Sequence, residues 1–69
     1  MTEGEFRAAV KVAMRDNPRW RYGQAVYNVA CGLSPLADVL CGTDLDPFYY
    51  DERVEAFVHR LRDHGAFDA

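Results

Sequence analysis

The sequence predicts an all-α fold, a compact bundle of three main helices plus one short helix, in a single domain of residues 1–69. Three observations support this prediction. Apolar residues recur at steps of three and four in three segments, which is the spacing of one helix face. Proline, glycine and capping residues separate these segments. No segment alternates apolar and polar residues as a half-buried strand does.

The first helix is predicted over residues 3–15. Thr2 and Glu5 have the spacing of a capping box, which satisfies free N–H groups at a helix start. The apolar face of this helix comprises Phe6, Ala9, Val10, Ala13 and Met14. Its basic residues lie four apart on the other side and are expected to face solvent.

Residues 17–33 predict a central helix, with Asn17 as its N-cap and Pro18 in its first turn. Apolar residues lie on two of its faces, so we expect other helices to cover it on two sides. Trp20 is expected in the core. Gly23 lies within the helical pattern, where a glycine often permits close approach of a neighbouring segment.

The rest of the chain predicts a short helix, an aromatic loop and a last helix. Ser34 and Pro35 begin the short helix, and Gly42 ends it. Residues 43–50 hold too many large aromatics for a simple linker and should fold over the core. Asp46 is expected to cap a single turn, and Asp51 to cap the last helix. That helix should end at residues 64–65, and residues 66–69 are expected to be a frayed tail.

The charge is distributed unevenly along the chain. Residues 1–33 contain five basic and three acidic residues, whereas residues 34–69 contain three basic and eight acidic ones, for a net charge of −3. This distribution suits a charged protein partner, and a dedicated nucleic-acid binder usually has a basic excess. We see no signal peptide and no apolar run of membrane-spanning length, so we expect a cytoplasmic protein without membrane contact. A homodimer would supplement the small core.

The sequence does not predict a metal or cofactor site. Cys31 and Cys41 are expected to be buried, reduced thiols, and their spacing from His59 and His64 matches no common zinc pattern. The acidic loop has the residue types of a calcium loop, but the position that needs glycine is Tyr49. No glycine-rich phosphate loop occurs and Ser34 is explained by capping, so we do not expect an enzyme.

The charged and aromatic residues that the helical pattern leaves over fall in two segments. We expect these segments to meet, with Arg19 or Arg21 paired to Asp44 or Asp46, and Trp20 packed on Phe48. Arginine and tyrosine are enriched at the energetically important positions of protein interfaces. The residues that we predict to bind a partner are Arg19, Arg21, Asp44, Asp46, Tyr49, Tyr50 and Asp51.

The same two segments carry a resemblance. Asn-Pro-Arg-Trp-Arg-Tyr-Gly-Gln-Ala-Val-Tyr-Asn at residues 17–28 and Gly-Thr-Asp-Leu-Asp-Pro-Phe-Tyr-Tyr-Asp at residues 42–51 resemble a family of small bacteriophage and bacterial proteins. That family has no established activity, cofactor or site. The resemblance implies a phage-encoded protein made in the cytoplasm of the bacterial host, where such proteins often bind a host protein.

We therefore predict a non-enzymatic protein-binding module that acts on a host protein or on itself. One alternative is a small transcriptional regulator, since residues 26–39 have helix-turn-helix spacing, although residues 35–41 lack side chains that read a base edge. The other is an acidic mimic of nucleic-acid phosphates. Its negative charges would be Asp44, Asp46, Asp51, Glu52 and Glu55.

Overall fold

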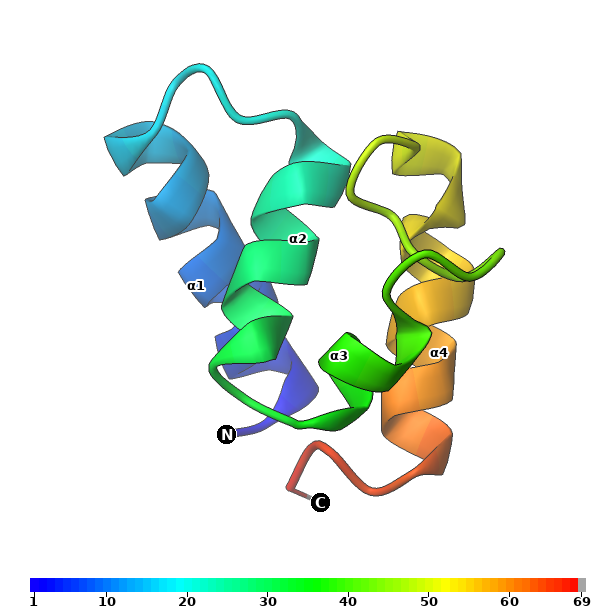
Figure 1. Cartoon of the computed structure of the whole chain (residues 1–69). Coiled ribbons are helices and arrows are strands. Elements are labelled where there is room, and N and C mark those ends of the chain that lie inside the picture. Colours follow the sequence, from blue (N-terminus) through cyan, green and yellow to red (C-terminus); the bar gives the residue numbers. More distant parts are fainter. Residues whose placement is uncertain (69) are drawn as a thin grey trace.

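The structure is a computed structural model, and it describes residues 1–68 (Figure 1). Its elements are the α-helices α1 (Glu3–Asp16), α2 (Tyr22–Cys31), α3 (Leu36–Leu40) and α4 (Val54–Asp63), and the 3-10 helix η1 (Asp51–Arg53). Residues 1–68 contain no β-strand, and their one β-bridge is an isolated contact between Thr2 and Asp68. The predicted fold class is confirmed: three main helices and one short helix form a compact bundle.

Helix α1 begins as the sequence predicts. The Thr2 hydroxyl accepts a hydrogen bond from the Glu5 N–H at 3.1 Å, and the Glu5 carboxylate accepts one from the Thr2 N–H at 2.8 Å. This reciprocal pair is the capping box. The helix buries Phe6 and Val10, which are four apart and therefore on one face.

Helix α2 begins later than predicted. Asn17 does not cap it; the Asn17 amide instead donates to the Ala13 carbonyl at 3.0 Å and ends α1. Residues 18–20 form a turn and a bend, so Trp20 lies before α2 and is half-buried against the core. The helix is nevertheless central, because α1 packs against one side of it and α3 and η1 against others (Figure 1).

The segment after α2 follows the predicted capping pattern. The Ser34 hydroxyl accepts a hydrogen bond from the Leu36 N–H at 3.2 Å at the start of α3. Gly42 follows α3 with a φ of +77°, a conformation that residues with a side chain rarely adopt. Pro47, in the loop between α3 and η1, is fully buried.

The carboxyl end of the chain is packed, and our prediction of a frayed tail over residues 66–69 was wrong. Gly65 has a φ of +72°, and the Ala66 N–H donates to the Leu61 carbonyl, which closes α4 with a Schellman motif. The Phe67 ring then lies 5.3 Å from the Phe6 ring. The Asp68 carboxylate pairs with the amino terminus of Met1 at 2.6 Å, so the two ends meet (Figure 1). Residue 69 lies outside the described residues.

One core joins the four α-helices. Its buried members are Phe6, Val10, Ala25, Val26, Ala30, Ala37, Leu40, Val54, Phe57, Val58 and Leu61. Cys31 and Cys41 do not belong to it, contrary to our prediction, because both are exposed free cysteines. Cys31 is the last residue of α2, and Cys41 follows the last residue of α3.

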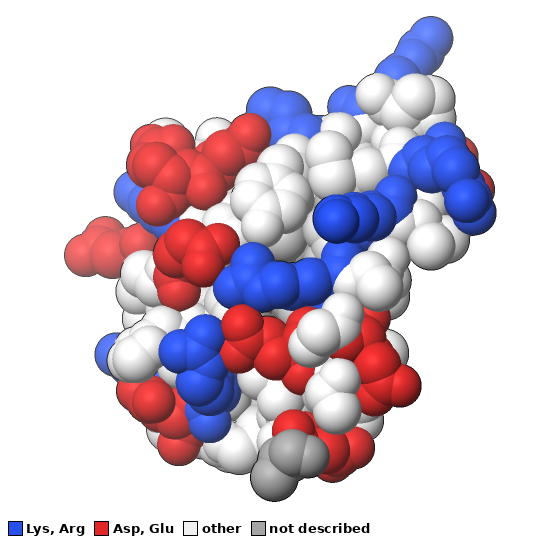
Figure 2. All heavy atoms as spheres, turned by 180° about the vertical axis from the view of Figure 1, so that it is seen from behind, with Lys and Arg blue, Asp and Glu red and all other residues white. Residues whose placement is uncertain are grey.

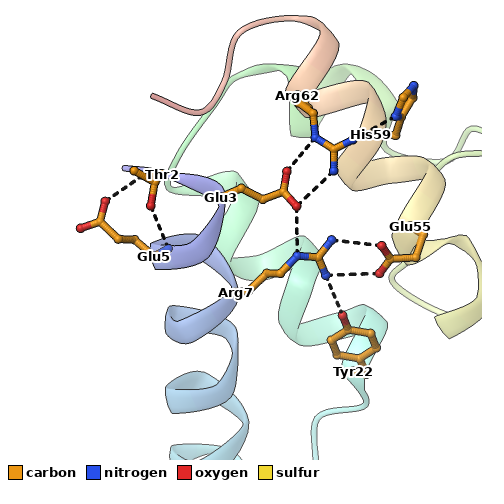
Figure 3. Close-up of polar contacts among 8 residues, drawn as sticks. All are labelled: Thr2, Glu3, Glu5, Arg7, Tyr22, Glu55, His59 and Arg62. Carbon is orange, nitrogen blue, oxygen red and sulfur yellow. Dashed lines mark hydrogen bonds and ion pairs between the residues drawn. The ribbon is translucent and has the colours of Figure 1, made fainter. Parts of the chain in front are cut away.

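Ion pairs join α1 to α4 on the surface (Figure 3). The Glu3 carboxylate accepts hydrogen bonds from Arg62 at 2.7 and 3.1 Å, and a third from Arg7 at 3.2 Å. Arg7 also donates to both carboxylate oxygens of Glu55, at 3.0 and 3.3 Å. Glu3 and Arg7 have the four-residue spacing of a pair within one helix, whereas the pairs with Arg62 and Glu55 depend on how α1 and α4 pack. None of the helices within residues 1–68 has the length and apolar character needed to cross a membrane.

Candidate functional site

The two segments that carry the predicted contact residues meet in the structure. The Arg21 guanidinium donates to the Phe48 carbonyl at 2.7 Å, and its Nε lies 4.0 Å from an Asp51 carboxylate oxygen. The acidic neighbour of Arg21 is therefore Asp51, and the predicted pairing with Asp44 or Asp46 was wrong. Arg19 is exposed and takes part in none of the ion pairs among residues 1–68.

A glycine permits this meeting. The Asp51 carboxylate accepts a hydrogen bond from the Gly23 N–H at 2.9 Å, in the first turn of α2. A Cβ atom at Gly23 would lie only 2.1 Å from the Pro47 carbonyl oxygen. Arg21, the residue before α2, provides no side-chain cap. Asp51 thus caps α2 rather than α4, which differs from our prediction, and only glycine leaves room for it.

Aromatic side chains continue the contact between the segments. The Phe48 ring packs edge-on against Tyr27 at 5.8 Å and against Tyr49 at 4.8 Å, measured between ring centroids. Within residues 1–68, these are the rings that pair with Phe48, and Trp20 is not among them. The predicted pairing of Trp20 with Phe48 was therefore wrong, because Trp20 lies in the turn before α2 and not on that helix.

Two neighbouring tyrosines lie at the surface beside this contact. Tyr49 is 72% exposed and Tyr50 is 46% exposed. The Arg21 guanidinium carbon lies 5.8 Å from the centre of the Tyr49 ring. The Arg53 guanidinium carbon lies 4.0 Å from the centre of the Tyr50 ring. Both distances fall within the range of a cation–π contact, so both rings are oriented although they are exposed.

The backbone below the tyrosines is held by a side-chain cap. The Asp46 carboxylate accepts one hydrogen bond from the Gly42 N–H at 2.8 Å and another from the Phe48 N–H at 2.9 Å. The predicted capping role of Asp46 is confirmed. Asp44 is exposed at the tip of the same loop. Carboxylate caps of this kind fix the conformation of a turn.

A hollow of about 430 Å³ lies among these residues. Its lining residues are Cys41, Gly42, Thr43, Asp44, Asp46, Tyr49, Tyr50 and Arg53. The structure therefore brings together four of the predicted contact residues, and Arg21 and Asp51 lie beside them. We call the following set the loop surface: Arg21, Asp44, Asp46, Tyr49, Tyr50, Asp51 and Arg53.

Sequence analysis missed Arg53. Its guanidinium donates to the Thr43 carbonyl at 3.4 Å as well as covering the Tyr50 ring. The only hint in the sequence was the spacing, because Tyr50 and Arg53 are three residues apart. In the structure a 3-10 turn lies between them. Side chains at that spacing lie one above the other in such a turn.

Two groups near the loop surface have raised pKa values, the Tyr27 hydroxyl and the Cys31 thiol. A hydrogen bond with Cys41 and partial burial raise the pKa of the Tyr27 hydroxyl. Partial desolvation raises the pKa of the Cys31 thiol. A thiol whose pKa is raised is less nucleophilic at neutral pH, because less of it is thiolate. Within residues 1–68, no group of three or more His, Cys, Asp or Glu residues is placed to hold a metal ion.

Comparison of the chain with protein-family models, with curated proteins and with solved structures gives no match. The resemblance to phage proteins therefore stays a prediction.

Proposed function

We propose that this protein is a non-enzymatic protein-binding module and that the loop surface contacts its partner. One observation carries the proposal. Tyr49 and Tyr50 are neighbouring and exposed, yet the cations of Arg21 and Arg53 orient their rings. Tyrosine and arginine are enriched among the residues that contribute most of the binding energy in protein interfaces.

The fixed loop lowers the entropic cost of binding. Ordering a flexible side chain at an interface costs about 0.5–1.5 kcal/mol. Asp46 holds the loop backbone through two hydrogen bonds, and Asp51 anchors it to the first turn of α2. The tyrosines therefore lose less freedom on association than they would in an unstructured loop.

The charge of the loop surface favours a partner with basic side chains. Three aspartates and two arginines compose it together with the tyrosines, and exposed Glu52 follows directly. The arginines lie against the tyrosine rings, whereas Asp44 is exposed at the tip of the loop. Complementary charge steers association and selects among partners. We propose further, from the resemblance alone, that the chain is phage-encoded and that its partner is a host protein in the bacterial cytoplasm.

The acidic-mimic alternative is weaker because most of its carboxylates already have partners. Asp46 accepts two backbone N–H groups, Asp51 accepts one, and Glu55 is paired with Arg7. A carboxylate that imitates a phosphate must be open to a basic surface.

The regulator alternative has little support from α3. This helix has five residues, and its exposed side chains include Asp38 and Val39. Neither can donate a hydrogen bond to a base edge or to a phosphate.

An affinity experiment with paired variants tests the proposal. The wild-type protein, Tyr49→Ser and Val12→Ser are each used to capture proteins from lysate of a candidate host. Val12 is 45% exposed on α1 and lines neither hollow, so it controls for loss of an exposed apolar side chain. We expect a protein that wild type and Val12→Ser retain and Tyr49→Ser loses, with purified binding weakened about tenfold or more.

Retention that is equal for wild type and Tyr49→Ser would contradict the loop surface as the contact. Binding that disappears when DNA is digested, and that weakens steeply with salt, would favour the regulator. Competition between DNA and this protein for the captured partner would favour the acidic mimic.

A further inference from the structure

A second hollow lies beside α1 and shares no residue with the hollow of the loop surface. Its volume is about 190 Å³. An engineered protein cavity of roughly 150 Å³ is large enough to bind benzene. The lining residues come from α1, α2 and α4, and they are Phe6, Arg7, Val10, Lys11, Met14, Tyr22, Val26 and Val58.

The inner part of this hollow is apolar. Phe6, Val26 and Val58 line it although each is at most 1% exposed, so the hollow reaches the hydrophobic core. Met14 also lines it and is half-buried. Apolar walls around a space of this size favour an apolar ligand group, because water there finds few hydrogen-bond partners.

The rim of the hollow is cationic and carries a hydroxyl. Arg7 and Lys11 are four apart on α1 and lie on the same side of that helix. Arg7 is already paired with Glu3 and Glu55, and it also donates to the Tyr22 hydroxyl at 3.5 Å (Figure 3). The Lys11 ammonium takes part in none of the hydrogen bonds or ion pairs found between side chains of residues 1–68.

Charged side chains of both signs border the uncharged surface that Figure 2 shows. Arg7 forms ion pairs with Glu3 and Glu55, and neither carboxylate forms an ion pair with Lys11.

We propose that this hollow binds a small amphipathic carboxylate, with an acyl chain about the length of that in octanoate. The chain occupies the apolar interior, and the carboxylate accepts hydrogen bonds from the Lys11 ammonium and the Tyr22 hydroxyl. Charge complementarity selects the anion, since a cationic head group would meet Lys11 and Arg7 at the rim. This site is independent of the proposed protein contact, because the two hollows have no residue in common.

A titration followed by NMR tests the site. Octanoate, octanol and octylamine, which share one chain and differ in the head group, are each added to the labelled full-length protein. We expect octanoate to shift the backbone signals of α1 and the first half of α2, with a dissociation constant of about 1 mM or lower. We expect octanol to bind about threefold to tenfold more weakly and octylamine to bind more weakly still.

Two variants separate the site from general surface attraction. Lys11→Gln should weaken octanoate binding about threefold to tenfold. Arg15→Gln, one helical turn further along α1, should leave it unchanged, because Arg15 does not line the hollow. Met14→Trp should reduce binding of both octanoate and octanol by filling the interior.

Three results would overturn the proposal. They are equal binding of octanoate and octylamine, equal effects of Lys11→Gln and Arg15→Gln, and signal shifts that fall outside the lining residues. Because the wild-type shifts alone map the site, a variant that fails to fold does not remove the test.

Discussion

The carboxylate of Asp51 caps helix α2 by accepting a hydrogen bond from the Gly23 N–H at 2.9 Å. The two residues are 28 positions apart. An N-cap usually comes from the residue just before a helix, but Arg21 provides no such bond here. The loop surface therefore depends on α2 for its position, and the first turn of α2 depends on the loop for a hydrogen-bond acceptor.

Replacement of Gly23 by alanine should destabilise the fold. The added Cβ would lie 2.1 Å from the Pro47 carbonyl oxygen, which belongs to the backbone and cannot rotate away. We expect the free energy of unfolding to fall by about 2–4 kcal/mol, as for other severe steric clashes in packed regions. Urea denaturation followed by circular dichroism measures this change.

Gly4→Ala is the matched control for that experiment. Gly4 is also in the first turn of a helix, but the nearest atom to its Cβ position is the Thr2 hydroxyl at 3.8 Å. Alanine there should change the stability by less than about 1 kcal/mol, and in the stabilising direction, because alanine favours helix. Equal losses for the two variants would contradict the role of Gly23.

Removal of the Asp51 cap should have a smaller effect. Asp51→Ala leaves the Gly23 N–H without its acceptor, and we expect a loss of about 0.5–2 kcal/mol in the free energy of unfolding. Asp51→Asn keeps an oxygen acceptor and should retain most of the stability. Glu52→Ala changes the exposed neighbour and should lie within about 0.5 kcal/mol of wild type. Denaturation midpoints of the three variants check this order. If Asp51→Asn loses as much stability as Asp51→Ala, the negative charge of Asp51 and not its oxygen acceptor stabilises the start of α2.

Local signals in the sequence predicted most of the fold. Thr2 and Glu5 form the capping box that their spacing predicts. Gly42 was predicted to end the short helix, and in the structure it follows that helix in the left-handed conformation. Such patterns predict well because all the interacting groups lie within a few residues of one another. The apolar steps of three and four likewise marked the buried faces of α1 and α4.

The start of α2 could not be predicted by the same means. Asn17 before Pro18 is a good N-cap pattern, but an asparagine can also end the preceding helix, and its amide bonds to Ala13. Local sequence does not distinguish these two roles. The true cap of α2, Asp51, is distant in sequence, so its role depends on tertiary structure alone.

Six of the seven residues of the loop surface were among the predicted contact residues, but Arg53 was missed, Arg19 lies outside the set, and the pairing of Arg21 was wrong. Composition identified Arg21, Tyr49 and Tyr50 as charged and aromatic residues without a place in the helical pattern. Which carboxylate faces Arg21 depends on how the loop crosses α2, and sequence spacing carries no information on that crossing. The packed tail was missed for the same reason, since Phe67 finds its partner on α1.

Phe67→Ala tests whether the carboxyl end contributes to stability. The Phe67 ring contacts the fully buried Phe6, and its loss would open the core at that end. We expect the free energy of unfolding to fall by about 1–3 kcal/mol, less than for a fully buried phenylalanine because Phe67 is half-buried. Tyr49→Ala is the control, and should change stability by less than about 0.5 kcal/mol since that ring is mostly exposed. Thermal unfolding that gives equal midpoints for wild type and Phe67→Ala would show that the tail does not stabilise the fold.

The ion pairs between α1 and α4 should make stability depend on pH. Hydrogen bonds from Arg62, and then from Arg7, hold the pKa of the Glu3 carboxyl below its ordinary value of about 4.3. A carboxyl whose pKa is lower in the folded state binds more protons in the unfolded state, so its contribution to stability is present above the ordinary value. That contribution is lost as the pH falls through the folded pKa.

Unfolding free energies of wild type, Arg62→Gln and Arg60→Gln, measured between about pH 6 and pH 3, test this dependence. Arg62→Gln removes the first hydrogen-bond donor of Glu3, so the Glu3 pKa should rise and the loss of stability on acidification should become smaller. Arg60 takes part in none of the ion pairs among residues 1–68, so Arg60→Gln should keep the wild-type slope. Some slope should remain in Arg62→Gln, because the capping box with Thr2 also lowers the pKa of Glu5. Identical slopes for all three proteins would mean that the pair between α1 and α4 is too screened by solvent to influence folding.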